Sequence, residues 1–140
     1  MADWFPDTSD AEGLEEARKA GFFGALAFCA MICLGVILLV AFDRTPTLDQ
    51  PTTDNTLPFI GMAIELGIVA TAAWRFKIGK GAIWGALVLV LFIVEVIGKI
   101  AAGTTNVGWL IAYAAIALAL LNGVRGAWAR RINSPTDVFE

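Results

Sequence analysis

Four long apolar runs constrain the fold of this chain more than any other feature of its sequence. They span residues 20–42, 57–76, 81–102 and 108–128. A helix needs about 20 apolar residues to cross the ~30 Å hydrocarbon core of a bilayer, so each run is long enough. In lipid, a helix satisfies all of its backbone hydrogen bonds within one segment. The sequence therefore predicts an all-α protein, a four-helix transmembrane bundle.

Little sequence remains outside these four runs. The chain has 140 residues, of which 58% are hydrophobic and 16% charged, whereas a soluble domain has about 25% charged residues. Residues 1–19 form an acidic N-terminal segment and residues 129–140 a short tail. Because the acidic segment precedes a run long enough to span, we expect no cleavable signal peptide. We predict a single membrane domain over 1–140, without a nucleic-acid surface.

The positions of the basic residues predict the orientation of the helices. Eight of the ten Lys and Arg residues lie before the first run, around the 77–80 turn or at the end of the fourth run. The other two connections, 43–56 and 103–107, hold only Arg44 between them. Short loops rich in Lys and Arg stay in the cytoplasm. We therefore predict that both termini are cytoplasmic, with the helices running up-down-up-down because their connections are short.

The N-terminal segment and the first run form one continuous helix in this interpretation. Ser9 and Glu12 have the spacing of a capping box, in which each side chain accepts a backbone hydrogen bond from the other end of the first turn. This predicts a short cytoplasmic helix that runs from Asp10 into the first span.

Four polar side chains fall inside the predicted spans at a similar depth. Counted from the outer ends, Glu65, Glu95 and Tyr113 lie about 12, 10 and 8 Å deep, at 1.5 Å per residue. Lys99 lies one turn shallower than Glu95. Ionisable residues inside a membrane usually face the bundle interior and are candidates for a functional site. We call Glu65, Glu95, Lys99 and Tyr113 the polar cluster.

Two interpretations of the polar cluster remain open. In the functional one, it is a proton or cation site, or a pocket for a polar headgroup. In the structural one, Lys99 neutralises Glu95 through an i,i+4 pair, Glu65 is protonated, and Tyr113 forms a hydrogen bond to one of them. Paired or neutralised charges are the usual finding for buried ionisable groups.

The end of the fourth run carries a second group of candidate residues. Tyr113 and Asn122 are nine residues apart, which is two and a half turns of a helix, so they point in opposite directions. If Tyr113 joins the polar cluster, Asn122 and the small residues beside it face outward. We therefore expect contact with a partner helix or a lipid headgroup at Ala119, Asn122, Gly123 and Arg125. The alternative for Arg125 is a simple membrane anchor that reaches the lipid phosphates.

Small residues recur at four-residue spacing along the predicted helices, notably Gly21, Ala25, Cys29 and Cys33 in the first and Gly81 and Gly85 in the third. Such spacing predicts close helix packing. It also suits the two cysteines, since a buried free Cys behaves as a small hydrophobe. The chain contains no histidine, which removes the commonest zinc ligand and the usual general base. We predict no cofactor, no metal site and no enzymatic activity.

The string LNGVRGAWARR at residues 121–131 is the most distinctive in the chain. A fourth helix that ends N-G-V-R-G-x-W-A resembles the end of many small four-helix bacterial inner-membrane proteins of unassigned function. The four-helix topology and a glutamate in the second helix are also similar to the DoxX-like group. The glycine-rich stretch of that group is partly present here as ELGIVATAA, residues 65–73. The resemblance implies the bacterial inner membrane and brings no activity with it.

Together these features predict a small integral membrane accessory or scaffold subunit. Its partners would be the lipid bilayer and either further copies of itself or a larger membrane complex, contacted through small-residue helix faces. The alternative is a small transporter or ion-conducting oligomer that uses Glu65 and Glu95. An intramembrane enzyme is a third possibility, for which the polar cluster supplies the acid–base groups.

Overall fold

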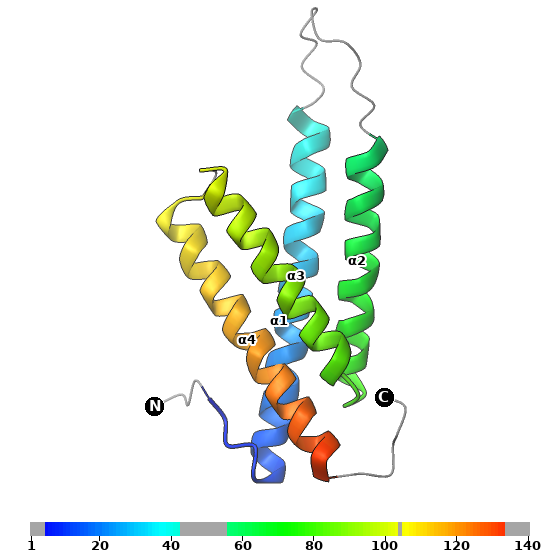
Figure 1. Ribbon diagram of the computed structural model, residues 1–140, viewed down its shortest axis with the longest axis vertical. Helices are drawn as coiled ribbons and strands as arrows, with labels where there is room; N and C mark the ends of the chain where they lie inside the picture. The colour runs from blue at the N-terminus through cyan, green and yellow to red at the C-terminus, as the bar shows by residue number, and fades with distance from the viewer. Residues whose placement is uncertain (1–4, 43–55, 104, 134–140) are drawn as a thin grey trace, which may run out of the picture.

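The computed structural model describes residues 5–42, 56–103 and 105–133. In these residues the chain forms four helices: α1 (Ala11–Phe42), α2 (Thr56–Lys77), α3 (Ala82–Ala101) and α4 (Val107–Asn133). Consecutive helices run in opposite directions, which confirms the predicted up-down-up-down bundle (Figure 1). Most of the predicted outer loop 43–56, and residues 134–140 of the predicted tail, lie outside the described residues.

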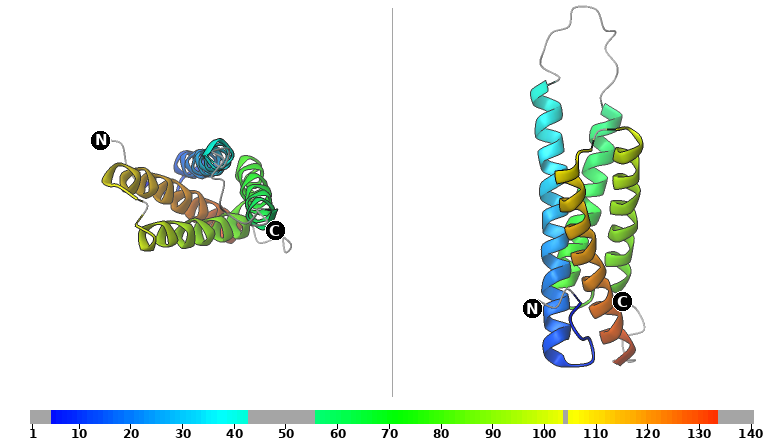
Figure 2. Two further views of the ribbon diagram at one scale, coloured as in Figure 1. Left: turned by 90° about the horizontal axis from the view of Figure 1, so that it is seen from above. Right: turned by 90° about the vertical axis from the view of Figure 1, so that its left-hand side faces the viewer.

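Helices α1, α3 and α4 are long and apolar enough to cross a membrane, over Ala11–Leu38, Ala82–Ala101 and Val107–Ile132. Helix α2 has 22 residues, or about 33 Å at 1.5 Å per residue, and stands beside the others in both views of Figure 2. Large apolar side chains cover the outer surface, such as Phe23 and Ile97 at 61% and 59% exposure. So large an apolar surface suits a bilayer and not water.

Helix α1 begins ahead of its apolar run, as predicted, but its first turn is capped differently. The Gly13 amide donates a hydrogen bond to Asp10 Oδ1 at 2.7 Å, which makes Asp10 the N-cap. The Ser9 amide instead donates to Asp7 Oδ1 at 3.0 Å, and this bond holds the pKa of Asp7 below its ordinary range. The predicted capping box on Ser9 is therefore wrong, and the residue that caps the helix is the next one, Asp10.

The turn between α2 and α3 forms because Gly79 adopts a positive φ of 79°. The Gly79 amide donates to the Phe76 carbonyl at 3.0 Å, and the Lys80 amide donates to the Arg75 carbonyl at 2.9 Å. This pair of bonds is a Schellman motif, which closes a helix through a left-handed glycine. The turn brings the start of α3 directly back against the end of α2.

The four helices form a ring in which α1 packs against α2 and α4, and α3 completes the ring between them. Toward the end at which α1 finishes and α2 begins, α3 and α4 lean away from α1 and α2 (Figure 1). Burial follows this divergence, since the buried side chains of each helix lie toward the other end. We call residues 11–32, 69–92 and 113–133 the basic half, and residues 33–42, 56–68 and 93–112 the open half.

The core of the basic half centres on the ring of Phe76, which is 1% exposed. A Cβ built on Gly21 or Gly123 would lie 3.1 Å from this ring, and one on Gly81 would lie 2.6 Å from it. A Cβ on Gly85 would overlap the ring as well. The ring thus sits in a socket of four glycines from α1, α3, α4 and the α2–α3 turn. The Gly81/Gly85 pair, whose spacing predicted close packing, therefore packs against this side chain and not against the backbone of a neighbouring helix.

Candidate functional site

The polar cluster contains an ion pair within α3. Lys99 Nζ donates a hydrogen bond to Glu95 Oε1 across one helical turn, as the i,i+4 spacing predicts. The two side chains are 35% and 27% exposed, so neither is enclosed by the chain itself. The other carboxylate oxygen, Glu95 Oε2, is buried and finds no hydrogen-bond partner among the described residues.

Helices α2 and α4 add the other two members of the cluster. Glu65 on α2 interacts electrostatically with both Glu95 and Lys99. On α4, the ring of Tyr113 lies under the ammonium group of Lys99, with 5.6 Å between Nζ and the ring centroid. The structure therefore brings Glu95, Lys99 and Tyr113 into contact, and Glu65 is linked to them only by this longer-range electrostatic interaction. The contact at Tyr113 is a cation–π interaction with its ring face.

Tyr113 marks the boundary between the buried core and the polar cluster. Its ring packs edge-on against Phe92 at 6.1 Å, and Phe92 packs against Phe28 at 4.9 Å between centroids. On its other side the Tyr113 ring stacks on Trp109 at 6.0 Å. An aromatic layer from α1, α3 and α4 thus closes the core. Glu65, Glu95 and Lys99 all lie on its open side.

Two apolar grooves lie beside the cluster. One, of about 240 Å³, lies between α3 and α4 and is lined by residues that include Val96, Ile97 and Leu110. The other, of about 440 Å³, lies between α1 and α2 and is lined by residues that include Cys33, Met62 and Leu66. Both grooves are open at the surface, where the helix pairs expose apolar side chains.

The expectation that Asn122 and its neighbours face outward is wrong. Asn122 is 7% exposed, and Ala119 and Gly123 pack against α1 in the same chain. A Cβ on Gly24 would lie 3.0 Å from that of Ala119, and one on Gly21 would lie 2.6 Å from Gly123 Cα. Two residues on opposite sides of α4 do not face the interior and the exterior of the bundle, because α4 has two neighbouring helices. It packs on α3 near Tyr113 and on α1 further along.

Arg125 contacts the N-terminal segment of its own chain. Its guanidinium lies 5.3 Å from the centroid of the Phe5 ring and donates a hydrogen bond to Asn122 Oδ1 at 3.4 Å. Contact of Arg125 with a lipid headgroup or a partner remains a prediction. The face of α4 that carries these residues is occupied within the chain.

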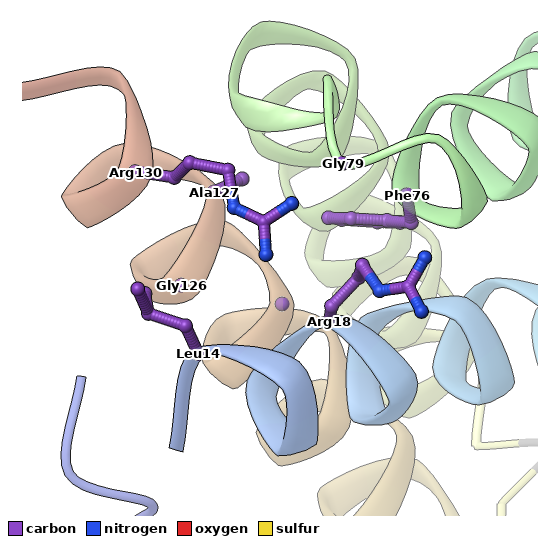
Figure 3. Close-up of a pocket in the computed structure, with 8 residues that line it drawn as sticks. Leu14, Arg18, Phe76, Gly79, Gly126, Ala127 and Arg130 are labelled. Atoms are coloured by element: carbon purple, nitrogen blue, oxygen red, sulfur yellow. The ribbon is translucent and has the colours of Figure 1, made fainter. Parts of the chain in front are cut away.

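A second polar site, in the basic half, did not emerge from the sequence. We call it the basic pocket (Figure 3); it is lined by Leu14, Arg18, Phe76, Gly79, Gly123, Gly126, Ala127 and Arg130. Arg18 comes from α1 and Arg130 from α4, 112 positions further along the chain. Both belong to the groups of basic residues from which the orientation of the helices in the membrane was predicted. The glycines that admit Phe76 and bring α1 against α4 also bring these two arginines to one space.

The two cysteines differ in their surroundings. Cys29 is half-buried and Cys33 is exposed on the open half, so the small-residue series on α1 packs closely only over its first part. Among the residues that the structure describes, no three acidic or cysteine side chains are grouped so that they could hold a metal ion.

Comparison of the chain with protein-family models, with curated proteins and with solved structures finds no match. The kind of protein it is therefore has to be inferred from its own sequence and structure. The helical bundle, with three helices able to cross a membrane and large apolar side chains on its outer surface, is that of a small integral membrane protein.

Proposed function

We propose that the chain is a non-enzymatic membrane subunit, an accessory or scaffold protein that binds another helical membrane chain through its open half. One observation carries this proposal. No described residue of the open half is buried, although all four helices continue through it. Helices that splay apart in this way bury little surface of their own, so the open half is suited to receive another helix.

The polar cluster supports a protein occupant over lipid tails alone. Glu95 and Lys99 are about one-third exposed at a level of the bundle where the surrounding surface is apolar. A charged side chain that faces hydrocarbon is costly, by about 2.5–3.5 kcal/mol at the bilayer centre. A neighbouring helix covers such a pair and adds polar partners, which acyl chains do not offer. A second copy and a larger membrane complex both meet this requirement.

The glycines of the open half provide a direct test. Gly67 on α2 and Gly98 on α3 have no atom within 4 Å of a built Cβ, so a side chain that starts there projects into open space. We expect Gly67→Leu or Gly98→Leu to lower the mass of the assembly extracted in mild detergent, with unchanged helical content. If the native chain extracts as a monomer, or neither variant changes the mass, the proposal is wrong.

A second candidate is a small transporter or ion-conducting oligomer that uses Glu65 and Glu95. The buried Glu95 Oε2, which lacks a hydrogen-bond partner among the described residues, and the carboxyl group of Glu65 on the neighbouring helix favour it. Such a pair suits transient binding of a proton or cation. Reconstituted vesicles would show a proton or cation flux that Glu65→Gln and Glu95→Gln abolish. Absence of flux from the native protein would remove this candidate.

A further inference from the structure

The basic pocket combines two arginines with a recess at one end of the bundle. Figure 3 shows Arg130 reaching from α4 across the pocket toward the Gly79 turn, and Arg18 extending from α1 beside Phe76. A Cβ on Gly79 would overlap a guanidinium nitrogen of Arg130, so the absence of a side chain there makes room for this arginine. We propose that the basic pocket binds a phosphate group, with Arg130 as its principal ligand.

The two arginines are held differently, and this assigns their roles. Arg18 donates a hydrogen bond to the Lys77 carbonyl, and its Nε donates to Glu15 Oε2 at 2.9 Å. These contacts fix Arg18 in place and partly neutralise it. Arg130 acts on Glu15 only at longer range, as an electrostatic interaction beyond ion-pair distance. Toward the residues that the structure describes, Arg130 therefore keeps donors for an external anion, while Arg18 lends charge and shape to the pocket wall.

Among the residues that the structure describes, the acidic ones near the pocket do not fill it. Glu15 forms ion pairs with Arg18 and, at 3.8 Å, with Lys19, both on its own helix. Glu12 and Glu16 lie on the exposed side of α1. The part of the lining that the structure describes contains no acidic residue, and two of its eight residues are arginines. The lining thus favours an anion over a cation.

The size and level of the pocket indicate the kind of anion. Its enclosed part is about 10 Å³, room for about one water molecule, so neither an organic ligand nor a whole phosphate group fits inside, and the proposed ligand is a small oxyanion held at the mouth. Nearby, Lys77 lies 6.0 Å above the Trp74 ring and Arg131 lies 5.8 Å from the Trp128 ring. Exposed tryptophans beside basic residues mark the headgroup level of a membrane.

Arginine is well suited to this ligand, since its planar fork donates two parallel hydrogen bonds to a phosphate. The same chemistry has two sources at this level: the headgroup of an anionic phospholipid and soluble inorganic phosphate. Full-length protein in mild detergent, titrated with dioleoylphosphatidylglycerol and observed by native mass spectrometry, measures the first. Competition by inorganic phosphate measures the second.

We expect Arg130→Gln to weaken binding of phosphatidylglycerol at least about tenfold, as for loss of a charge-assisted hydrogen bond. Arg131→Gln is the matched control, because it removes the same charge from the next residue, which lies outside the pocket lining. It should weaken binding at most about fivefold, through the general surface charge. Circular dichroism and a monodisperse elution profile establish that both variants fold.

Loss of phosphatidylglycerol binding in Arg130→Gln but not in Arg131→Gln supports the site. If millimolar inorganic phosphate displaces the bound lipid, and this displacement requires Arg130, the site is supported with soluble phosphate as the source. Equal loss in the two variants overturns the proposal, since the effect is then one of net charge. Equally strong binding of zwitterionic dioleoylphosphatidylcholine to the native protein also overturns it for an anionic lipid.

Discussion

The basic half and the open half of this bundle are built from the same four helices, yet they pack in opposite ways. In the basic half, glycines on α1 and α4 bring the two backbones together, and four glycines enclose Phe76. In the open half, Gly35, Gly61, Gly67 and Gly98 each face empty space at their Cβ positions. Small residues in a membrane helix therefore indicate where another helix is able to approach closely. Whether such a contact forms within the chain depends on a large side chain from a neighbouring helix that fills the space.

Truncation of Phe76 should produce the largest difference between the two halves. Phe76→Ala leaves a cavity that the four surrounding glycines cannot fill, and we expect a loss of about 3 kcal/mol or more in unfolding free energy. Phe23→Ala is the control, because Phe23 is 61% exposed on the outer face of α1 and should change stability little. Reversible unfolding in mixed micelles measures both. A similar loss in the two variants would mean that the glycine socket does not hold the bundle together.

Alanine in place of glycine should have opposite effects in the two halves. A Cβ on Gly123 overlaps the backbone of Gly21, which no rotamer change relieves, so Gly123→Ala should cost roughly 1–3 kcal/mol. Gly67→Ala meets no atom within 4 Å and should be neutral or stabilise by up to about 1 kcal/mol through helix propensity. Denaturation of the two variants in parallel checks the signs. A destabilising Gly67→Ala would show that the open half is already packed in the isolated chain.

Removing one member of the ion pair should cost more than removing both. Lys99→Leu leaves Glu95 without its cation, and we expect a loss of roughly 1–2 kcal/mol, less than for a fully buried pair because both side chains are partly exposed. The double variant Glu95→Leu/Lys99→Leu should recover most of that loss. Should the double variant prove as unstable as the single one, the pair does more than neutralise itself, and the transporter gains support.

The smallest effect is expected at the start of α1. Asp10→Ala removes the acceptor of the Gly13 amide and should cost about 1 kcal/mol or less. Ser9→Ala should have no measurable effect, because the side chain that caps the helix belongs to Asp10. Amide exchange of residues 11–14 reports the fraying directly. Equal fraying in both variants would restore the capping box that the sequence suggested.

The sequence predicted the fold, and the contacts of Lys99 with Glu95 and Tyr113, because helix length and residue depth follow from regularities along each helix. Apolar length predicted the four helices, and residue depth placed Glu65, Glu95, Lys99 and Tyr113 in one layer. The outward face of α4 was predicted wrongly, because rotation about one helix does not say which neighbour lies on each side. The basic pocket was missed for a related reason. Arg18 and Arg130 meet only through the glycine contact of α1 with α4, which their own positions in the sequence do not reveal.

The central claim, that another helical chain covers the open half in the membrane, is tested most directly by site-specific photo-cross-linking in native membranes. Ile97 and Ile83 are matched positions, since both lie on α3 and are 59% and 51% exposed. Ile97 belongs to the open half and Ile83 to the basic half. A diazirine side chain at position 97 should give a discrete protein adduct, and one at position 83 should label lipid alone. No protein adduct at position 97, or the same adduct at both positions, would contradict the account.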